Sequence, residues 1–379
     1  MSFKQGVNNL IKPRASQHEP DWSLIITTAV IVVFGLVMLS SASLVVAYKE
    51  YNDSYYFFKH QLLGLFAGII AFLFFARVDY HKWKKYAFGF LIFSIVMLLL
   101  VFIPGLSAEY GKSRSWINIF GFSLQPSEFV KLSFLLYLAA WLESRHKKLE
   151  DISRGIGHFV VILGIICLLM LLQPDIGTLS IIVLTSLVVY FVGGGNIKHI
   201  LAIILLSIAA VSIMAHFMPY QANRIKCFID PSYSKDEFCY QINQSLIAVG
   251  SGGIFGRGLG ASRQKYSYLP EVYNDSIFAV IGEETGLIMS AGLVLLFMFL
   301  FYRGYLISKR APDGFGANLA IGIVSWIVIQ VIINIGGMIK LMPMTGVPLP
   351  LISYGGSALL AALSALGILV NISKQTRLR

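Results

Sequence analysis

The fold is decided by an uninterrupted apolar stretch near the start of the chain, which reads SLIITTAVIVVFGLVMLSSASLVVA at residues 23–47. The stretch carries no charged side chain, and about 20 consecutive apolar residues suffice for a helix to cross a bilayer. Comparable stretches recur along the rest of the chain. The sequence therefore predicts ten transmembrane helices, at 23–47, 57–76, 86–106, 126–143, 159–174, 176–193, 199–219, 276–302, 317–339 and 350–372.

Composition agrees with this prediction and excludes two other classes of protein. Of the 379 residues 56% are hydrophobic and only 13% are charged, against about 25% charged residues in a soluble domain. The mean hydropathy is +0.74. A soluble globule and a disordered chain are both excluded. The net charge of +11 would suggest a nucleic-acid partner in a soluble protein, but in a membrane protein its placement sets orientation, and we expect no nucleic acid here.

Basic residues gather in short loops between the predicted spans. The segments HKWKK at 81–85 and RHKK at 145–148 lie on the side that both termini share. The positive-inside rule assigns that side to the cytoplasm. The predicted fold class is therefore an all-α polytopic membrane protein, N-in and C-in, with one long extracytoplasmic loop at 220–275 between the seventh and eighth helices.

The predicted domain organisation is simple. Residues 1–22 form a cytoplasmic tail, residues 23–379 form a single transmembrane domain, and a short cytoplasmic tail begins near residue 373. Residues before the first span are polar, and that span is longer than the apolar region of a cleavable signal. We therefore expect the first helix to act as its own insertion signal.

The three cysteines divide by location. Cys167 lies inside the fifth predicted span, where it reads as a small core residue. Cys227 and Cys239 both fall in the long outside loop. If that loop faces an oxidising space, a disulfide between them is favoured over two free thiols.

Ionisable side chains at membrane depth are costly, so each one is a candidate functional residue. Glu128 lies in the first turn of a predicted helix, and Lys131 follows at i+3, which predicts either an internal ion pair or, together with the nearby Arg114, a ligand site. Gln173 and Asp175 flank a proline between the fifth and sixth spans. Asp175 either caps the next helix or lines a polar cavity.

The outside loop contains a glycine-rich stretch, GSGGIFGRGLG, at 250–260. No strand precedes it and no Gly-Lys-Ser/Thr follows, so a nucleotide-binding loop is disfavoured, although its backbone amides could approach a pyrophosphate. Asp275 ends the loop as either a helix cap or a functional carboxylate. Glu283 and Glu284 are adjacent and point about 100° apart, so we expect one of them to pair with Lys131 or another cation inside the bundle.

A second irregular stretch, KLMPMTGVPLPLISYGGS, occupies residues 340–357. Its prolines and glycines stand where the last predicted helix begins. Bilayers tolerate broken helices only where protein or water satisfies the backbone groups. The stretch therefore predicts a re-entrant segment, which forms either a tight helix junction or the wall of a polar cavity that includes Ser353.

Six motifs in this order carry a resemblance to a known family: GKSRSWI at 111–117, QPSE at 125–128, QPDIGT at 173–178, YLPE at 268–271, IGEE at 281–284 and LPLISYGG at 349–356. The chain resembles the SEDS family (shape, elongation, division and sporulation), the polytopic glycosyltransferases that polymerise bacterial peptidoglycan. VMLSSAS at 37–43 followed by YYFFKHQ at 55–61 looks more like the division member FtsW than the elongation member RodA. Ser115, Ser276 and the Cys227/Cys239 pair depart from the family pattern.

The resemblance implies an inverting glycosyltransferase that joins lipid II units by β-1,4 bonds during septal cell-wall synthesis. Asp275 matches the catalytic aspartate of the family and would act as the general base for the acceptor hydroxyl. The resemblance implies that the substrate-binding residues are Arg114, Arg224, Lys265, Gln244, Ser245, Glu271 and Ser353. It further implies a cavity shaped by Glu128, Lys131, Gln173, Asp175, Glu283 and Glu284, with Mg²⁺ or Mn²⁺ as a possible cofactor.

The same resemblance implies the partners and the location. Partners are lipid II, the nascent glycan, a class B penicillin-binding protein that acts as transpeptidase, and other divisome or elongasome proteins. The location is the bacterial cytoplasmic membrane, with the active site outside. Within the resemblance, an elongation-type polymerase is the alternative role. Two other classes remain open: a lipid II flippase, for which buried charges and broken helices are equally suitable, and a scaffold that recruits the transpeptidase.

Overall fold

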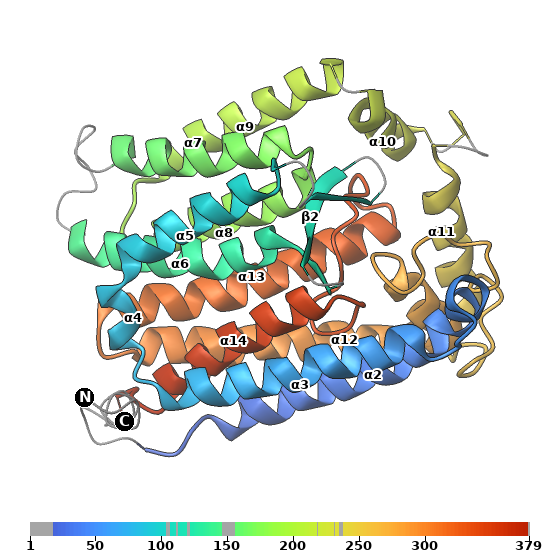
Figure 1. Ribbon diagram of the computed structural model, residues 1–379, viewed down its shortest axis with the longest axis horizontal. Helices are drawn as coiled ribbons and strands as arrows, with labels where there is room; N and C mark the ends of the chain where they lie inside the picture. Colours follow the sequence, from blue (N-terminus) through green and yellow to red (C-terminus); the bar gives the residue numbers. More distant parts are fainter. Residues whose placement is uncertain are drawn as a thin grey trace.

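The structure, a computed structural model, describes residues 18–103, 107–110, 113–119, 122–145, 156–217, 219–230, 232–234 and 238–377. Most helices lie side by side along the long axis of the molecule (Figure 1). The two termini lie at one end, and the segments between α9 and α12 lie at the opposite end. The long stretch that we predicted as a loop thus forms one end of the bundle.

The helices are α2 (Trp22–Tyr51), α3 (Tyr56–Arg77), α4 (His81–Lys85), α5 (Ala87–Leu100), α6 (Pro126–Arg145), α7 (Gly157–Leu172), α8 (Ile176–Val192), α9 (Ile197–Phe217), α10 (Pro219–Ile229), α11 (Tyr240–Gly252), α12 (Ile277–Arg310), α13 (Gly314–Met338) and α14 (Gly356–Ser373). Each predicted span overlaps one of them. In the described part of the chain α2, α3, α12, α13 and α14 are long and apolar enough to cross a membrane, and α5, α7, α8 and α9 supply shorter apolar segments.

Burial separates the central helix from the peripheral ones. In α13, 89% of the most apolar window is buried, whereas in α3 only 17% is. α3 therefore presents a long apolar face outward, with Phe66, Ile70 and Phe74 all exposed. A continuous apolar face of this kind is unfavourable in water and suits lipid. The chain is a multi-pass membrane protein.

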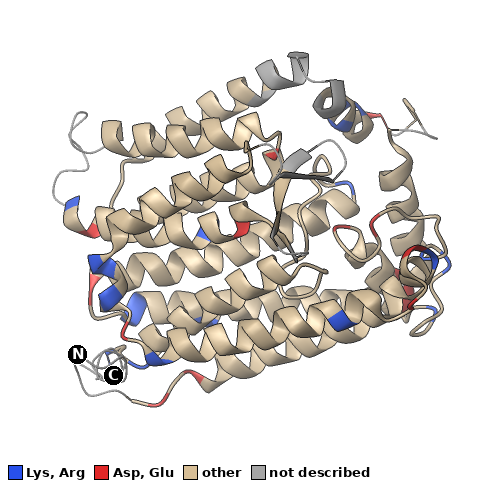
Figure 2. Ribbon diagram, in the orientation of Figure 1, with Lys and Arg blue, Asp and Glu red and all other residues tan. Residues whose placement is uncertain are grey.

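Lys and Arg positions gather on the ribbon around α4, at the end of the molecule where α2 begins and α14 ends (Figure 2). At this end His81 bridges Asp79, at 2.7 Å, and Asp313, at 2.9 Å. Asp313 also caps α13 by accepting the backbone N–H of Gly316 at 2.8 Å. These contacts tie α4 to the central helix at the end that the positive-inside rule predicts to be cytoplasmic.

The all-α prediction is wrong between α5 and α6. There the chain forms a three-stranded antiparallel sheet of β1 (Ser107–Tyr110), β2 (Ser113–Ile119) and β3 (Phe122–Leu124), in the order β1-β2-β3. In β2 the alternate residues Ser115 and Ile117 are buried, Asn118 is exposed, and Ile117 pairs with Leu124. The alternation suits a strand with one packed face, and the ladder satisfies the backbone groups of a segment too polar for a membrane helix.

The predicted outside loop at 220–275 also contains more structure than expected, because α10 and α11 lie inside it. Both helices are short and rich in polar residues, so neither has the apolar length that reveals a membrane span. Their positions place two helix faces beside the start of α12.

Candidate active site

The segment between α13 and α14 is not helical, as its prolines and glycines predicted. Lys340, Gly346 and Leu351 all have positive φ, at 58°, 77° and 67°. Two amide side chains of α13 hold this segment. Asn334 donates to the carbonyl oxygen of Val347 at 2.7 Å, and Gln330 donates to that of Pro348 at 2.8 Å. These side chains thereby satisfy backbone carbonyl groups that have no helical hydrogen-bond partner inside the bundle.

Asp275 lies immediately before α12 with only 5% of its surface exposed. The cap of α12 is Ser276, which makes no side-chain capping bond, so the alternative in which Asp275 caps the helix is wrong. Gln241 of α11 donates to the Asp275 carboxylate at 3.3 Å, and Asn334 donates to the Asp275 backbone oxygen at 2.8 Å. The backbone of Asp275 is thus anchored to α13 while its carboxylate faces α11.

An arginine from α10 shares this site. A Cβ atom on Gly346 would lie 3.3 Å from Nη2 of Arg224 and 3.6 Å from Oδ2 of Asp275, so both side chains border the same glycine. Burial raises the pKa of Asp275 to about 7, and the Glu271 carboxylate adds to this rise. The Arg224 guanidinium and the bond from Gln241 oppose it. A carboxyl group that titrates near neutrality can accept a proton from a substrate hydroxyl and release it again.

The turn before Asp275 is built by two residues that we predicted to bind substrate. Glu271, with φ of 52°, accepts the backbone N–H groups of Asn274 and Ser276 through its carbonyl oxygen at 3.0 and 3.1 Å. The hydroxyl of Ser353 donates to the Asn274 carbonyl at 2.7 Å and accepts from the Leu349 amide at 2.8 Å. In this structure Ser353 therefore fixes the loop beside Asp275.

Sequence reasoning missed four amide side chains: Gln61, Gln330 and Asn334 in predicted spans, and Gln241 in the predicted outside loop. Gln61 of α3 donates to the Ser353 carbonyl at 3.1 Å and accepts the Gly355 amide at 3.0 Å. A signal was present, because an amide in an apolar helix is unfavourable without a partner.

Lys131 does not pair with Glu283 or Glu284, so that part of the predicted charge network is wrong. Its ammonium donates to Glu128 of its own helix at 2.8 Å and to Gln330 of α13 at 2.9 Å. Residues three apart on a helix are neighbours, so this pair needs no partner from elsewhere. The internal ion pair that we considered for α6 is the arrangement observed.

The two glutamates of α12 pair with the preceding loop instead. Lys265, 4% exposed, donates to Glu284 at 2.9 Å, and Ser41 of α2 donates to the same carboxylate at 2.8 Å. Glu283 accepts from the Ser262 hydroxyl at 2.6 Å and from the backbone amides of the two following residues. The expected pairing with another cation is thus met by Lys265. The resemblance implied that Lys265 binds substrate, but in this structure its ammonium is already engaged by Glu284 inside the protein.

The glycine-rich stretch supports a break in α12. Gly286 has φ of 73° and interrupts the helix, and the freed carbonyl oxygens of Glu283 and Glu284 accept the amides of Arg257 and Gly258, each at 3.0 Å. In the other direction, the Leu287 amide donates to the carbonyl oxygen of Gly253 at 2.9 Å. The expectation that these amides bind a pyrophosphate is therefore wrong for Arg257 and Gly258, since α12 uses both.

Asp175 caps α8 by accepting the Thr178 amide at 3.0 Å, which is the first of the two alternatives that we weighed. Burial raises the pKa of Asp175, and the α6 segment contributes Gln125, whose amide lies 3.5 Å from the carboxylate. Gln173 is fully buried and donates to the Leu98 carbonyl at 2.8 Å. Both residues fix the start of α8, which packs at Gly177 against the irregular segment that borders Asp275.

The remaining predicted residues divide into three groups. Gln244 and Ser245 lie on α11, where Gln244 is half-buried and Ser245 donates to the Gln241 carbonyl at 2.9 Å. Arg114 belongs to β2, and its side chain lies outside the described residues. Cys227 and Cys239 are joined in a buried disulfide, whereas Cys167 is a free thiol.

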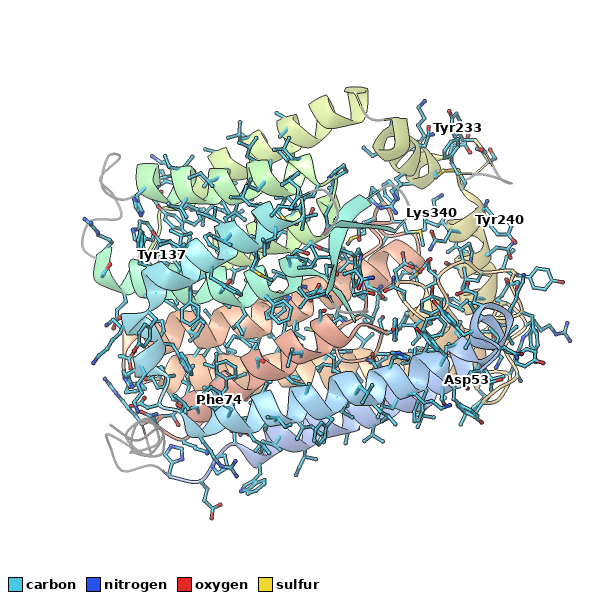
Figure 3. The ribbon with its side chains drawn as sticks, in the orientation of Figure 1. Asp53, Phe74, Tyr137, Tyr233, Tyr240 and Lys340 are labelled. Carbon is cyan, nitrogen blue, oxygen red and sulfur yellow. A yellow bond between two sulfur atoms is a disulfide. The ribbon has the colours of Figure 1, made fainter. Side chains whose placement is uncertain are left out.

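The residues around Asp275 therefore come from five parts of the chain: α10, α11, the start of α12, α13 and the segment after α13. Figure 3 places Tyr240, the first residue of α11, and Lys340, which follows α13, toward the end of the molecule away from Phe74. The site lies at the end opposite the termini.

Comparison with known proteins supports this description over nearly the whole chain. A family model described as a cell cycle protein, that of FtsW, RodA and SpoVE, matches residues 21–378. Stage V sporulation protein E of Bacillus subtilis is 42% identical, and the match covers 94% of this chain and 98% of that protein. A probable peptidoglycan glycosyltransferase FtsW of Geobacter metallireducens is 36% identical, with coverage of 94% and 95%.

Solved structures share the same architecture. The rod shape determining protein RodA of Thermus thermophilus is 26% identical with a TM-score of 0.69, covering 94% of this chain and 98% of that chain. A chain from a peptidoglycan synthase complex shares the fold, with a TM-score of 0.76 at 24% identity and coverage of 93% and 97%. Because the family model and relatives above 30% identity span almost all of this sequence, the chain belongs to the FtsW/RodA/SpoVE family of cell cycle proteins, the SEDS family.

Proposed function

We propose that the protein is a peptidoglycan glycosyltransferase that polymerises lipid II into β-1,4 glycan strands for septal cell-wall synthesis. The observation that carries this proposal is the buried Asp275, whose pKa of about 7 lies within range of neutral conditions and whose neighbours include Arg224 and Gln241. The names of the FtsW relatives, each a probable peptidoglycan glycosyltransferase, supply the substrate class.

The proposed reaction follows from the chemistry of these side chains. The acceptor presents the 4-hydroxyl of its GlcNAc, and an alcohol is a poor nucleophile until a base takes its proton. As the oxygen bonds to the anomeric carbon of the donor MurNAc, the deprotonated Asp275 accepts the hydroxyl proton. The bond from that carbon to the pyrophosphate breaks, and the polyprenyl pyrophosphate leaves with the electron pair. Attack opposite the leaving group converts the α-linked donor into a β-1,4 product.

Positive charge is needed where the pyrophosphate develops charge. Arg224 is the basic residue placed beside Asp275 in this structure. In the described residues no group of three His, Cys, Asp or Glu side chains converges, so the proposal assigns no set of protein ligands to Mg²⁺ or Mn²⁺. A divalent cation is proposed only as a counter-ion that arrives with the substrate pyrophosphate.

Orientation and partners complete the proposal. The end that carries Asp275 lies opposite the Lys- and Arg-rich end with the termini, and the positive-inside rule assigns the latter to the cytoplasm. Asp275 would then work at the outer face of the bacterial cytoplasmic membrane. A related fold occurs in a peptidoglycan synthase complex that coordinates polymerization and crosslinking, which favours a class B penicillin-binding protein as the transpeptidase partner.

Purified protein incubated with lipid II in detergent tests the proposal directly, with and without the cognate transpeptidase. We expect glycan chains from the wild-type protein and none from Asp275→Asn. Flipping has no meaning in detergent, so absence of chains from wild-type protein with its partner would favour the flippase. If this protein localises along the side wall of the cell rather than at the septum, the elongation role is supported instead.

A further inference from the structure

The disulfide between Cys227 and Cys239 joins the two helices that face Asp275. Arg224 lies three residues, or about one helical turn, before Cys227 in α10. Gln241 lies in the first turn of α11, two residues after Cys239. The covalent link therefore lies close in sequence to both Arg224 and Gln241, which the two helices place beside Asp275.

The packing of the two helices differs. α11 packs against α12 and α13, whereas α10 packs mainly against its chain neighbour α9. Both cysteines are buried, with 3% and 0% of their surface exposed. The position of α11 is thus set by the bundle, and the disulfide transmits that position to α10 and to Arg224.

We propose that the Cys227–Cys239 disulfide is a positioning element for the catalytic carboxylate, because it holds Arg224 and Gln241 together against Asp275. The inference rests on the proposed function of Asp275 as a base and adds a redox condition to it. The site is complete only when the two thiols are oxidised.

The consequence for Asp275 has a definite sign. The charged groups that act on its carboxylate are Glu271, which raises its pKa, and Arg224, which lowers it, while α11 and α13 contribute the neutral amides Gln241 and Asn334. Opening the disulfide frees Arg224 and leaves Glu271 in place. The pKa of Asp275 then rises, and a smaller fraction of the base is deprotonated at neutral pH.

The main test is the double variant Cys227→Ser/Cys239→Ser beside the wild type, with Cys167→Ser as a matched control because that thiol lies in α7 and is free. Lipid II polymerisation is followed against pH. Loss of a nearby opposite charge shifts a pKa by about one unit, so we expect a roughly fivefold loss near pH 7 and recovery at alkaline pH. Cys167→Ser should keep the wild-type profile.

Chemical reduction gives a reversible version of the same test. Dithiothreitol attacks the disulfide in two exchange steps, which leave two cysteine thiols and the cyclic oxidised form of the reagent. The reduced wild-type protein should reproduce the profile of the double variant, and reoxidation should restore the original one. Arg224→Gln should have little further effect in the double variant, because the disulfide acts through Arg224.

A second measurement does not depend on polymerisation. Carbodiimides modify protonated carboxyl groups, so the extent of labelling at Asp275, measured by mass spectrometry against pH, reports its protonation. We expect the labelling midpoint to lie about one unit higher in the double variant. An unchanged midpoint, or an equal loss of activity at every pH, overturns the inference and leaves the disulfide a purely structural bond. Failure of the wild-type protein to make glycan overturns the proposed function, while the midpoint still decides the inference.

Discussion

The side-chain amide of Asn334 donates to the backbone oxygen of Asp275 at 2.8 Å and to that of Val347 at 2.7 Å. One residue of the central helix thus anchors both the start of α12 and the irregular segment that borders the site. Asn334 is 2% exposed, so neither carbonyl has water as a substitute partner.

We predict that Asn334→Asp lowers polymerisation although it preserves the size of the side chain. The substitution removes both donated hydrogen bonds, and each buried carbonyl left unsatisfied costs about 1–3 kcal/mol. Lipid II polymerisation and the thermal unfolding midpoint measure the two effects. Wild-type rates from Asn334→Asp would show that the anchor is dispensable.

Replacing Asp275 with Asn should abolish polymerisation. A general base contributes roughly 10²–10⁴-fold to the rate, and asparagine keeps the shape of the side chain without the base. A gel of glycan products from lipid II measures the loss. Asp230→Asn is the matched control, because Asp230 is exposed and its carboxylate accepts the backbone amide of Ser232 at 2.9 Å, outside the proposed site. Equal activity of the two variants contradicts the assignment.

The acid limb of the pH profile should respond to the charges around Asp275. Its pKa of about 7 means that activity of the wild-type protein rises as pH increases through that value, since the base must be deprotonated. Glu271→Gln removes a like charge and should move the limb to lower pH, whereas Arg224→Gln removes an opposite charge and should move it to higher pH. Polymerisation rates across the pH range, at saturating lipid II, test both signs. Shifts in the same direction for both variants would refute this account.

Stability should depend on His81 at the opposite end. Hydrogen bonds with Asp313 and Asp79 raise its pKa from 6.5 to about 9. A group whose pKa is raised on folding stabilises the folded state fully below its unfolded pKa, and this contribution is lost as pH rises through the folded value. The thermal midpoint of the wild-type protein should therefore fall as pH rises toward 9. His81→Gln should start lower and show a flatter pH dependence, and an equally steep fall in that variant would assign the effect to another group.

Charge reversal should identify the partner of Lys131. Breaking a buried ion pair on one side typically costs about 3–5 kcal/mol, so Lys131→Glu alone should destabilise the protein strongly. The double variant Glu128→Lys/Lys131→Glu restores opposite charges within α6 and should recover part of the thermal stability. Lys131→Glu/Glu284→Lys should not, because Glu284 pairs with Lys265. Rescue by the second combination instead of the first would contradict the observed pairing.

Much of the fold could be predicted because membrane helices carry their own signal. The apolar stretch at 23–47 and the comparable stretches after it located every long helix. A chain segment inside hydrocarbon must satisfy its own backbone hydrogen bonds, and an α-helix does so. The irregular segment after α13 was predicted from its prolines and glycines. The sheet at β2 and the helices α10 and α11 were not, because short polar segments have no comparable length requirement.

Asp275 and Arg224 were selected as candidate residues from the sequence, whereas Gln241 and the grouping of these three side chains were not. Asp275 could be selected from its motif, and the Cys227/Cys239 pair could be noted from its place in the outside loop. Arg224 and Gln241 lie 51 and 34 residues before Asp275 in the sequence. Nothing in local spacing brings residues so far apart to one carboxylate, since only the packing of α10 and α11 does so.

By itself, the sequence determined that the chain is a multi-pass membrane protein, where its long helices lie, and which family it resembles, because these properties follow from local hydrophobicity and short motifs. Only the tertiary structure decided which charges pair. Lys131 pairs with Glu128 and Gln330, and Lys265 pairs with Glu284, although the sequence allowed other combinations. The physical reason is that a buried charge is stabilised by whichever partner the packed helices place within about 3 Å, and that distance is a property of the assembled bundle.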